Sequence, residues 1–137
     1  MGEYGEMTSL SCAALHGHTG VLEALLDRGV HPDERDRLRQ VPLVPAATGT
    51  AEGQPAAVEL LLDRGADLEA ELNRGTALEW AACFGYGGMV RYLVGRGAVV
   101  RPTLLPHLRR HAEERVGRRQ AYGDIAAVLQ TAAGSGS

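Results

Sequence analysis

Apolar residues occur along the chain in short blocks with helical spacing, and a glycine follows each block. The first block has three apolar residues at positions i, i+3 and i+4, on one face of a helix: Leu10, Ala13 and Ala14. The second block forms a wider apolar stripe from Val21, Leu22, Leu25 and Leu26. Gly17 and Gly29 stand at the ends of the blocks, where a glycine adopts the positive φ that closes a helix. The pattern therefore predicts two short helices joined by a tight turn.

The same pattern occurs three times along the chain. Residues 8–29 and 76–97 match position by position without a gap, and residues 41–65 match both when three extra residues within 48–54 are allowed. A single helix pair cannot cover its own apolar face, whereas stacked pairs bury these faces in one continuous core. We therefore expect an all-α solenoid of about four helix-turn-helix units.

The segment after Arg101 predicts a further helix pair of different composition. An amphipathic helix is expected over 103–116, and its charged positions form a strongly polar face. A last helix follows, with Ile125, Val128 and Leu129 as its apolar stripe. The end unit of a stack needs a polar outer face to stay in solution. We interpret 103–133 as a degenerate C-terminal capping repeat and 134–137 as a flexible tail.

Three features of these copies resemble the ankyrin repeat. They are the Thr-x-Leu-x-x-Ala-Ala openings at Thr8 and Thr76, the step of 33 residues from Thr8 to Val41, and the ending Leu-Leu-Asp-Arg-Gly-Ala-Asp at Leu61–Asp67. The resemblance implies L-shaped units with short hairpin or loop connections, in which a hairpin projects sideways ahead of two antiparallel helices. It divides the chain into an N-terminal extension at 1–7 and ankyrin repeats at 8–40, 41–75 (with an insertion at 48–54) and 76–102.

Composition and charge narrow the class of function. The net charge of the chain is −3 at pH 7. Proteins that bind nucleic acids are usually basic, so this charge does not favour nucleic-acid binding. No apolar run approaches the roughly 20 residues that cross a bilayer, and residues 1–7 lack the basic start of a secretory signal. All 14 basic residues are arginines, which together with abundant Ala, Gly and Leu is typical of a GC-rich bacterial genome. We therefore expect a cytoplasmic, bacterial protein that binds neither nucleic acid nor a membrane.

Few groups of residues offer catalytic chemistry. Cys12 and His16 stand four positions apart on one predicted helix, and Cys83 lies in the third copy. Structural zinc sites use four ligands at defined spacing, and a catalytic cysteine needs a neighbouring base. The sequence indicates neither, and it has no phosphate-binding glycine loop. We expect no cofactor, no metal and no catalysis, and keep a thiol or metal enzyme that uses Cys12, His16 and Cys83 as the weakest alternative.

The ankyrin resemblance also implies a binding surface. In such stacks the hairpin tips, here Arg35–Gln40 and Glu69–Gly75, and the ends of the inner helices line a concave groove. Arginine and aromatic side chains anchor protein interfaces, and both types gather at these positions. The residues assigned to partner binding are Leu15, His16, Arg35, Arg37, Leu38, Arg39, Gln40, Asn73, Arg74, Trp80, Cys83, Phe84 and Tyr86.

We therefore predict a non-catalytic protein–protein interaction module that acts as a monomer. Its partner is expected to present an acidic and apolar patch, because arginines stand beside aromatic residues in the predicted groove. An alternative from another class is an accessory or inhibitory domain of a larger enzyme or toxin system. Trp80 has two open interpretations, exposure on the groove or packing against the next repeat.

Overall fold

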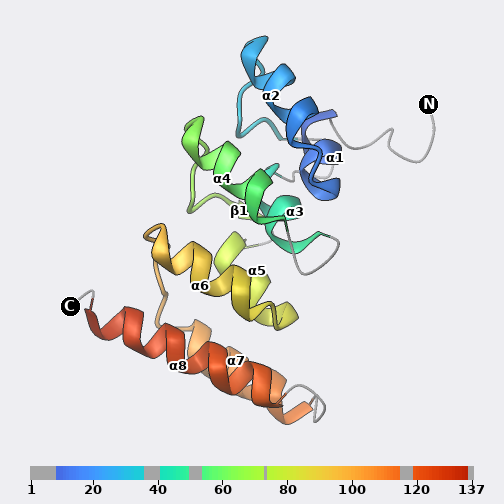
Figure 1. The fold of residues 1–137 in the computed structure, drawn as a ribbon. Coiled ribbons are helices and arrows are strands. Elements are labelled where there is room, and N and C mark those ends of the chain that lie inside the picture. Colours follow the sequence, from blue (N-terminus) through green and yellow to red (C-terminus); the bar gives the residue numbers. More distant parts are fainter. Residues whose placement is uncertain (1–8, 36–40, 50–53, 73, 115–118, 136–137) are drawn as a thin grey trace.

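The computed structural model describes residues 9–35, 41–49, 54–72, 74–114 and 119–135. Within this part, helices form four pairs that stack in a row (Figure 1). The pairs are α1 (Ser9–His16) with α2 (Thr19–Asp27), α3 (Leu43–Thr48) with α4 (Pro55–Asp63), α5 (Ala77–Phe84) with α6 (Gly87–Gly95), and α7 (Leu104–Glu114) with α8 (Arg119–Ser135). The expected all-α solenoid of helix pairs is confirmed.

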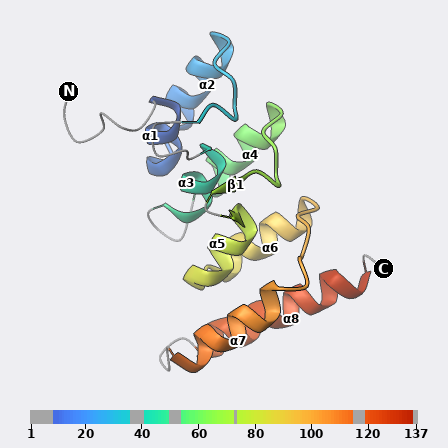
Figure 2. The ribbon, with the colours of Figure 1, turned by 180° about the vertical axis from the view of Figure 1, so that it is seen from behind.

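The helices lie in two columns. The inner column contains α1, α3, α5 and α7, and the outer column contains α2, α4, α6 and α8 (Figures 1 and 2). In the inner column α1 packs on α3, α3 on α5 and α5 on α7, while in the outer column α2 packs on α4 and α6 on α8. The two helices of each pair also pack on each other. Each unit therefore contacts mainly its neighbours, as expected for a repeat protein.

Alanine pairs on the inner helices bring the units close together. Each of the first three inner helices carries two adjacent buried alanines: Ala13 and Ala14, Ala46 and Ala47, and Ala81 and Ala82. The leucine one turn earlier is also buried in every copy, at Leu10, Leu43 and Leu78. Small side chains at a helix contact reduce the distance between helix axes. The recurring Leu-x-x-Ala-Ala pattern therefore builds one continuous core.

Two of the predicted helix ends show why glycine stands there. Gly17 and Gly85 follow α1 and α5 with φ of 70° and 80°, in the left-handed region that residues with a Cβ avoid. α3 ends differently, because Gly49 has an extended backbone and a longer connection leads to α4. Directly before α4, the Gln54 N–H donates to the Ala46 carbonyl of α3 at 2.7 Å.

A short hairpin precedes the third helix pair. Its strands β1 (Glu71–Leu72) and β2 (Gly75–Thr76) are antiparallel, with Glu71 opposite Thr76 and Leu72 opposite Gly75. This turn falls within the predicted tip at Glu69–Gly75. Residues 36–40 of the other predicted tip lie outside the described residues.

Two sequence expectations are corrected by the structure. Val21, expected in the apolar stripe of α2, is 50% exposed. Its counterparts Ala57 and Met89 are buried, because their units have a described unit before them. The helix α8 ends at Ser135 and so includes residues 134 and 135 of the predicted tail, since the alanines before them favour helix.

Candidate protein-binding surface

The inner helix of the third unit begins with a capping box. The Thr76 hydroxyl accepts from the Glu79 N–H at 3.3 Å, and the Glu79 carboxylate accepts from the Thr76 N–H at 3.0 Å. These bonds satisfy N–H groups that the start of a helix leaves without an intrahelical partner. They fix α5 directly at the end of the hairpin and hold the Glu79 carboxylate near the connection to the next unit.

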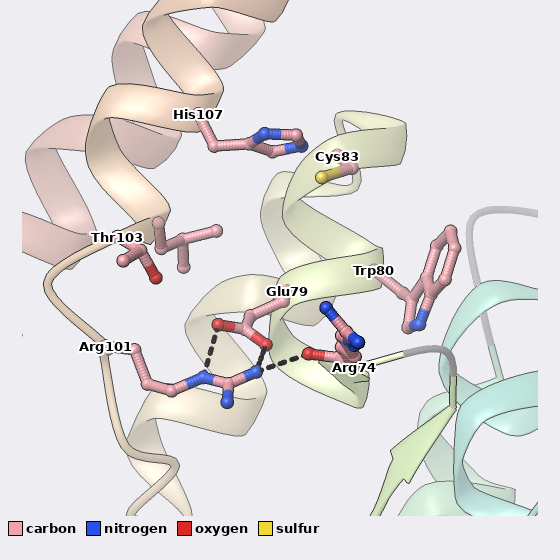
Figure 3. Close-up of a pocket in the computed structure, with 9 residues that line it drawn as sticks. Arg74, Glu79, Trp80, Cys83, Arg101, Thr103 and His107 are labelled. Atoms are coloured by element: carbon pink, nitrogen blue, oxygen red, sulfur yellow. Dashed lines mark hydrogen bonds and ion pairs between the residues drawn. The ribbon is translucent and has the colours of Figure 1, made fainter.

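Arg101, in the connection from α6 to α7, ties several segments together (Figure 3). Its Nε donates to Glu79 Oε2 at 2.8 Å, and its Nη2 donates to Glu79 Oε1. The same Nη2 donates to the Arg74 carbonyl at 2.7 Å, and Nη1 donates to Glu71 Oε1 at 3.3 Å. Burial raises the pKa of Glu79, but hydrogen bonds from Arg101 and Thr76 outweigh it and lower the pKa below the ordinary 4.5. Glu79 is therefore a paired carboxylate at neutral pH.

Arg74 occupies a turn conformation that few side chains adopt. Its φ of 69° lies in the left-handed region, which costs a residue other than glycine roughly 1–3 kcal/mol. The bond from Arg101 to the Arg74 carbonyl stabilises this turn. The Arg74 side chain is exposed, and no carboxylate of the described residues pairs with its guanidinium. The hairpin therefore presents a positive charge next to α5 (Figure 3).

Trp80 packs on the hairpin that precedes its own helix, while part of its ring stays exposed. Its Nε1–H donates to the Leu72 carbonyl at 2.9 Å. The indole also lies against Gly75, where an added Cβ would meet Nε1 at 2.8 Å. Gly75 is therefore needed because of this close approach.

Three aromatic rings continue from the hairpin along α5 to the turn before α6. The ring centroids of Trp80 and Phe84 are 6.2 Å apart, and those of Phe84 and Tyr86 are 5.6 Å apart, with both pairs stacked. Such pairs are stabilised beyond the burial of their apolar area. Phe84 is nevertheless 41% exposed. We call Trp80, Phe84 and Tyr86 the aromatic strip, and its accessible apolar area is available for contact.

A cavity of about 450 Å³ opens beside the aromatic strip, between the hairpin, α5 and the start of α7 (Figure 3). Trp80 and Cys83 line it from α5, and Leu104 and His107 line it from α7. Figure 3 shows His107 pointing from α7 towards α5. The other lining residues are Arg74, Gly75, Glu79, Arg101 and Thr103. A cavity of this size accommodates a small ligand or side chains of a partner.

The environment of Cys83 does not favour nucleophilic chemistry. Burial, together with the nearby Glu79 carboxylate, raises the pKa of the Cys83 thiol above its ordinary value of 9.0. The thiol is therefore protonated at neutral pH, and a thiol is a much weaker nucleophile than a thiolate. Cys12 lies two units away on α1. Across the ranges that the structure describes, no group of three or more His, Cys, Asp or Glu side chains has a metal-binding arrangement.

The structure gathers part of the predicted binding set into one place. Arg74, Cys83 and Trp80 line the cavity, and the rest of the aromatic strip continues from it. Arg35 reaches the same hairpin from the first unit, because its Nη1 donates to the Glu71 carbonyl at 3.1 Å.

The remaining predicted residues are not brought to this place. Leu15 and His16 lie at the end of α1, two units away. Leu15 packs against Gly49 after α3, and the His16 ring centroid is 5.8 Å from that of His18. The other residues of the set lie outside the described part: Arg37, Leu38, Arg39, Gln40 and Asn73.

Sequence reasoning missed three residues of this surface: Glu79, Arg101 and His107. Glu79 had a recognisable signal, the Thr-x-x-Glu capping box. Arg101 also had one, because it replaces the acidic residue that the repeat alignment places at Asp33 and Glu69. His107 had none, since its position depends on how α7 packs against α5.

Comparison with known protein families identifies the class of protein. The family model described as "Ankyrin repeats (3 copies)" matches residues 10–103. The chain belongs to the ankyrin repeat family, whose members are in general non-catalytic protein–protein interaction modules. No helix in the ranges described here combines the length and the apolar character that crossing a bilayer requires.

The relatives that the chain resembles are longer proteins. Over 99 residues it is 38% identical to Ankyrin repeat and KH domain-containing protein 1 of Homo sapiens, covering 70% of this chain and 4% of that protein. Over 101 residues it is 36% identical to Ankyrin repeat and KH domain-containing protein mask of Drosophila melanogaster, covering 72% and 2%. Over 93 residues it is 32% identical to Putative E3 ubiquitin-protein ligase XBAT31 of Arabidopsis thaliana, covering 66% and 20%. The chain therefore spans a small part of these relatives.

Proposed function

We propose that this chain is a non-catalytic protein-binding module that uses the hairpin, the aromatic strip and the cavity of its third unit. The observation that carries the proposal is a stacked, partly exposed aromatic strip, with Phe84 41% exposed, beside the exposed Arg74. No carboxylate of the described residues pairs with the Arg74 guanidinium. Aromatic and arginine side chains contribute most of the binding free energy in many protein interfaces. A partner that brings an apolar side chain to the cavity and a carboxylate to Arg74 fits this combination.

The proposed contacts extend beyond this centre. They include Arg35, which bonds to the hairpin, and Leu15 and His16 as a second region at the end of α1. We also propose that the chain acts as a monomer in the cytoplasm and that its partner is a protein. In this proposal it binds no nucleic acid, no membrane and no cofactor. The acidic net charge of −3 supports the exclusion of nucleic acid.

We assign a capping role to residues 103–133. Their apolar residues are buried against the stack: Leu104, Leu108, Ile125 and Leu129. Arg109 and Arg110 of the same helix α7 are exposed. A unit that covers the core on one side and presents charge on the other closes a repeat stack.

The test is capture of a partner from the native host by the immobilised full chain, with identification by mass spectrometry. Phe84→Ala and Arg74→Glu are each expected to lower retention of that partner at least about tenfold. Two matched controls change an exposed valine and an exposed arginine elsewhere, as Val99→Ala and Arg91→Glu, and should retain it. Equal retention by all four variants would exclude this surface.

A second candidate function is that of an accessory or inhibitory domain of a larger enzyme or toxin system. The relatives favour it, because the matched ankyrin segment covers 2% to 20% of much longer proteins. If the captured partner is an enzyme, its rate is expected to change when the chain is added. If the rate of the enzyme stays unchanged at a saturating concentration of the chain, the chain binds the enzyme without regulating it.

A further inference from the structure

The cavity between the hairpin, α5 and the start of α7 carries an uncompensated positive charge. The charged side chains that line it are Arg74, Glu79 and Arg101. Arg101 pairs with Glu79, since its Nε donates to Glu79 Oε2 at 2.8 Å and its Nη2 donates to Oε1. Among the residues that the structure describes, no carboxylate pairs with the Arg74 guanidinium. The charge of Arg74 is therefore left for an anionic group of a ligand.

Arg101 also holds the turn that carries Arg74 (Figure 3). Its Nη2 donates to the Arg74 carbonyl at 2.7 Å, and its Nη1 donates to Glu71 Oε1 at 3.3 Å. Without Arg101, the Glu79 carboxylate would line the cavity without a bound cation and would repel a second carboxylate. Arg101 is therefore a positioning residue, because it neutralises Glu79 and fixes the turn from which the Arg74 guanidinium projects.

The lining of the cavity becomes apolar one helical turn further along α5. Cys83 follows Glu79 by four residues, about 5.4 Å along the helix axis. Trp80 adds part of its indole ring, and Leu104 adds an aliphatic side chain from α7. Burial and the nearby Glu79 carboxylate raise the pKa of the Cys83 thiol. The thiol is therefore neutral and packs as a small apolar group.

A ligand that uses both ends of this cavity joins a carboxylate to an apolar group over about one helical turn, roughly 5 Å. The C-terminal residue of a polypeptide does so by itself, because its α-carboxylate and its side chain are bonded to the same Cα. An internal acidic residue needs a second residue for the apolar end, and its chain has to enter and leave between three segments of this protein. The cavity volume of about 450 Å³ lies in the lower part of the roughly 300–1,000 Å³ range of ligand sites. These dimensions favour the end of a chain.

We propose that the cavity binds the C-terminal residue of the partner protein. The α-carboxylate of that residue pairs with the Arg74 guanidinium, and its apolar side chain packs against Trp80, Cys83 and Leu104. Hydrogen bonds between a guanidinium and a carboxylate are among the strong ones in proteins, and capture of a terminal carboxylate is a recurring way to recognise a peptide. This inference rests on the proposed function, since it names the part of the partner that the third unit binds.

The test titrates the full chain with three short peptides. The first is acetyl-Gly-Ser-Gly-Leu with a free C-terminal carboxylate, the second is its C-terminal amide, and the third is acetyl-Gly-Asp-Gly-Leu amide, whose carboxylate is internal. Trp80 is the single tryptophan of the chain and lines the cavity, so its fluorescence reports occupancy. We expect a saturable shift to shorter wavelength with the free acid and at least about tenfold weaker binding of both amides. Equal binding of the free acid and either amide, or no saturable shift with the free acid, would overturn the proposal.

Arg74→Gly removes the guanidinium without straining the fold. The backbone at Arg74 has a φ of 69°, which glycine adopts more readily than arginine. We expect this variant to unfold at the same or a higher urea concentration than the natural chain, yet to bind the free acid at least about tenfold more weakly. Arg91→Gln is the matched control, because it removes an exposed arginine of α6 and should leave binding unchanged. Full binding by Arg74→Gly would contradict the assigned role of Arg74.

The role of Arg101 has a separate test in the ratio of the affinities for the free acid and the amide. Arg101→Gln is expected to lower this ratio towards one, because the Glu79 carboxylate then repels the ligand carboxylate. Adding Glu79→Gln is expected to restore the preference for the free acid, since it removes that charge and glutamine also serves in a capping box. If the double variant shows no preference, Arg101 does not act by neutralising Glu79.

The chain-end proposal and the proposed function fail in different ways. Two glycines added to the C-terminus of the captured partner are expected to lower its retention at least about tenfold, because they displace the apolar C-terminal residue. If retention depends on Phe84 but not on the partner's C-terminus, the chain-end proposal is wrong and the aromatic strip remains the binding surface. If the free acid binds while retention does not depend on Phe84, the aromatic strip is wrong and the cavity alone binds a chain end.

Discussion

At the scale of single residues, close packing at a glycine positions the central side chain of the candidate surface. The Trp80 ring lies against Gly75 and its Nε1–H donates to the Leu72 carbonyl. The sequence places Trp80 at the predicted groove, because the alignment of the repeats puts residue 80 on the inner helix of the third copy. It does not predict the hydrogen bond of the indole to the Leu72 carbonyl, because that bond depends on the path of the β1–β2 hairpin. In the turn of this hairpin, Arg74 adopts the left-handed backbone conformation.

Gly75→Ala tests this packing. The added Cβ would lie 2.8 Å from Nε1 and 3.2 Å from Cδ1 of Trp80, so the indole must move away from Leu72. We expect the free energy of unfolding to fall by roughly 1–3 kcal/mol. We also expect the fluorescence of the single tryptophan to shift to longer wavelength as the ring becomes more exposed.

Gly88→Ala is the matched control, because an added Cβ at Gly88 meets nothing within 4 Å. It is expected to keep the tryptophan emission of the natural chain and to be at least as stable, by up to about 1 kcal/mol more, because Gly88 lies within α6 and alanine favours helix. If Gly75→Ala behaved in the same way as this control, close packing at residue 75 would not hold Trp80 in place.

At the scale of elements, one ion pair connects α5 of the third unit to the segment that leads into α7. Glu79 caps α5 and also binds Arg101, which lies in the connection to α7. The sequence predicts the helices on both sides, since their apolar periodicity is local. It gives a signal for the capping box but not for its bond to Arg101, because that contact joins residues 22 positions apart.

The pH dependence of stability tests this connection. The pKa of Glu79 is lowered in the folded chain, so its carboxylate stabilises the fold above the ordinary pKa of 4.5. That stabilisation is lost as the pH falls through the lowered pKa. We therefore expect urea unfolding to show the largest difference between the natural chain and Glu79→Gln near neutral pH. The difference should shrink in a series of measurements below pH 4.5.

Glu34→Gln serves as the control for this series, because it removes a carboxylate from an exposed side chain. It is expected to follow the natural chain at every pH. A difference between Glu79→Gln and the natural chain that stayed constant with pH would show that the charge of Glu79 does not stabilise the fold.

At the scale of the whole molecule, the repeat determines both what the sequence predicts and what it leaves open. Three copies of one pattern predict the row of helix pairs, because each unit must bury the same apolar face. The pattern does not say on which side the first unit lacks a described neighbour, so it predicts Val21 in the apolar stripe of the second helix although the side chain is half exposed. The cavity is equally unpredictable from local patterns, because α7 supplies one of its walls from outside the three regular copies.

The most direct measurement is hydrogen exchange of the full chain with and without its captured partner. Binding through the aromatic strip and the cavity predicts slower exchange at residues 74–86 and 101–108 in the complex, and unchanged exchange in α2, α4 and α6. Slower exchange confined to these outer helices would contradict binding through the third unit.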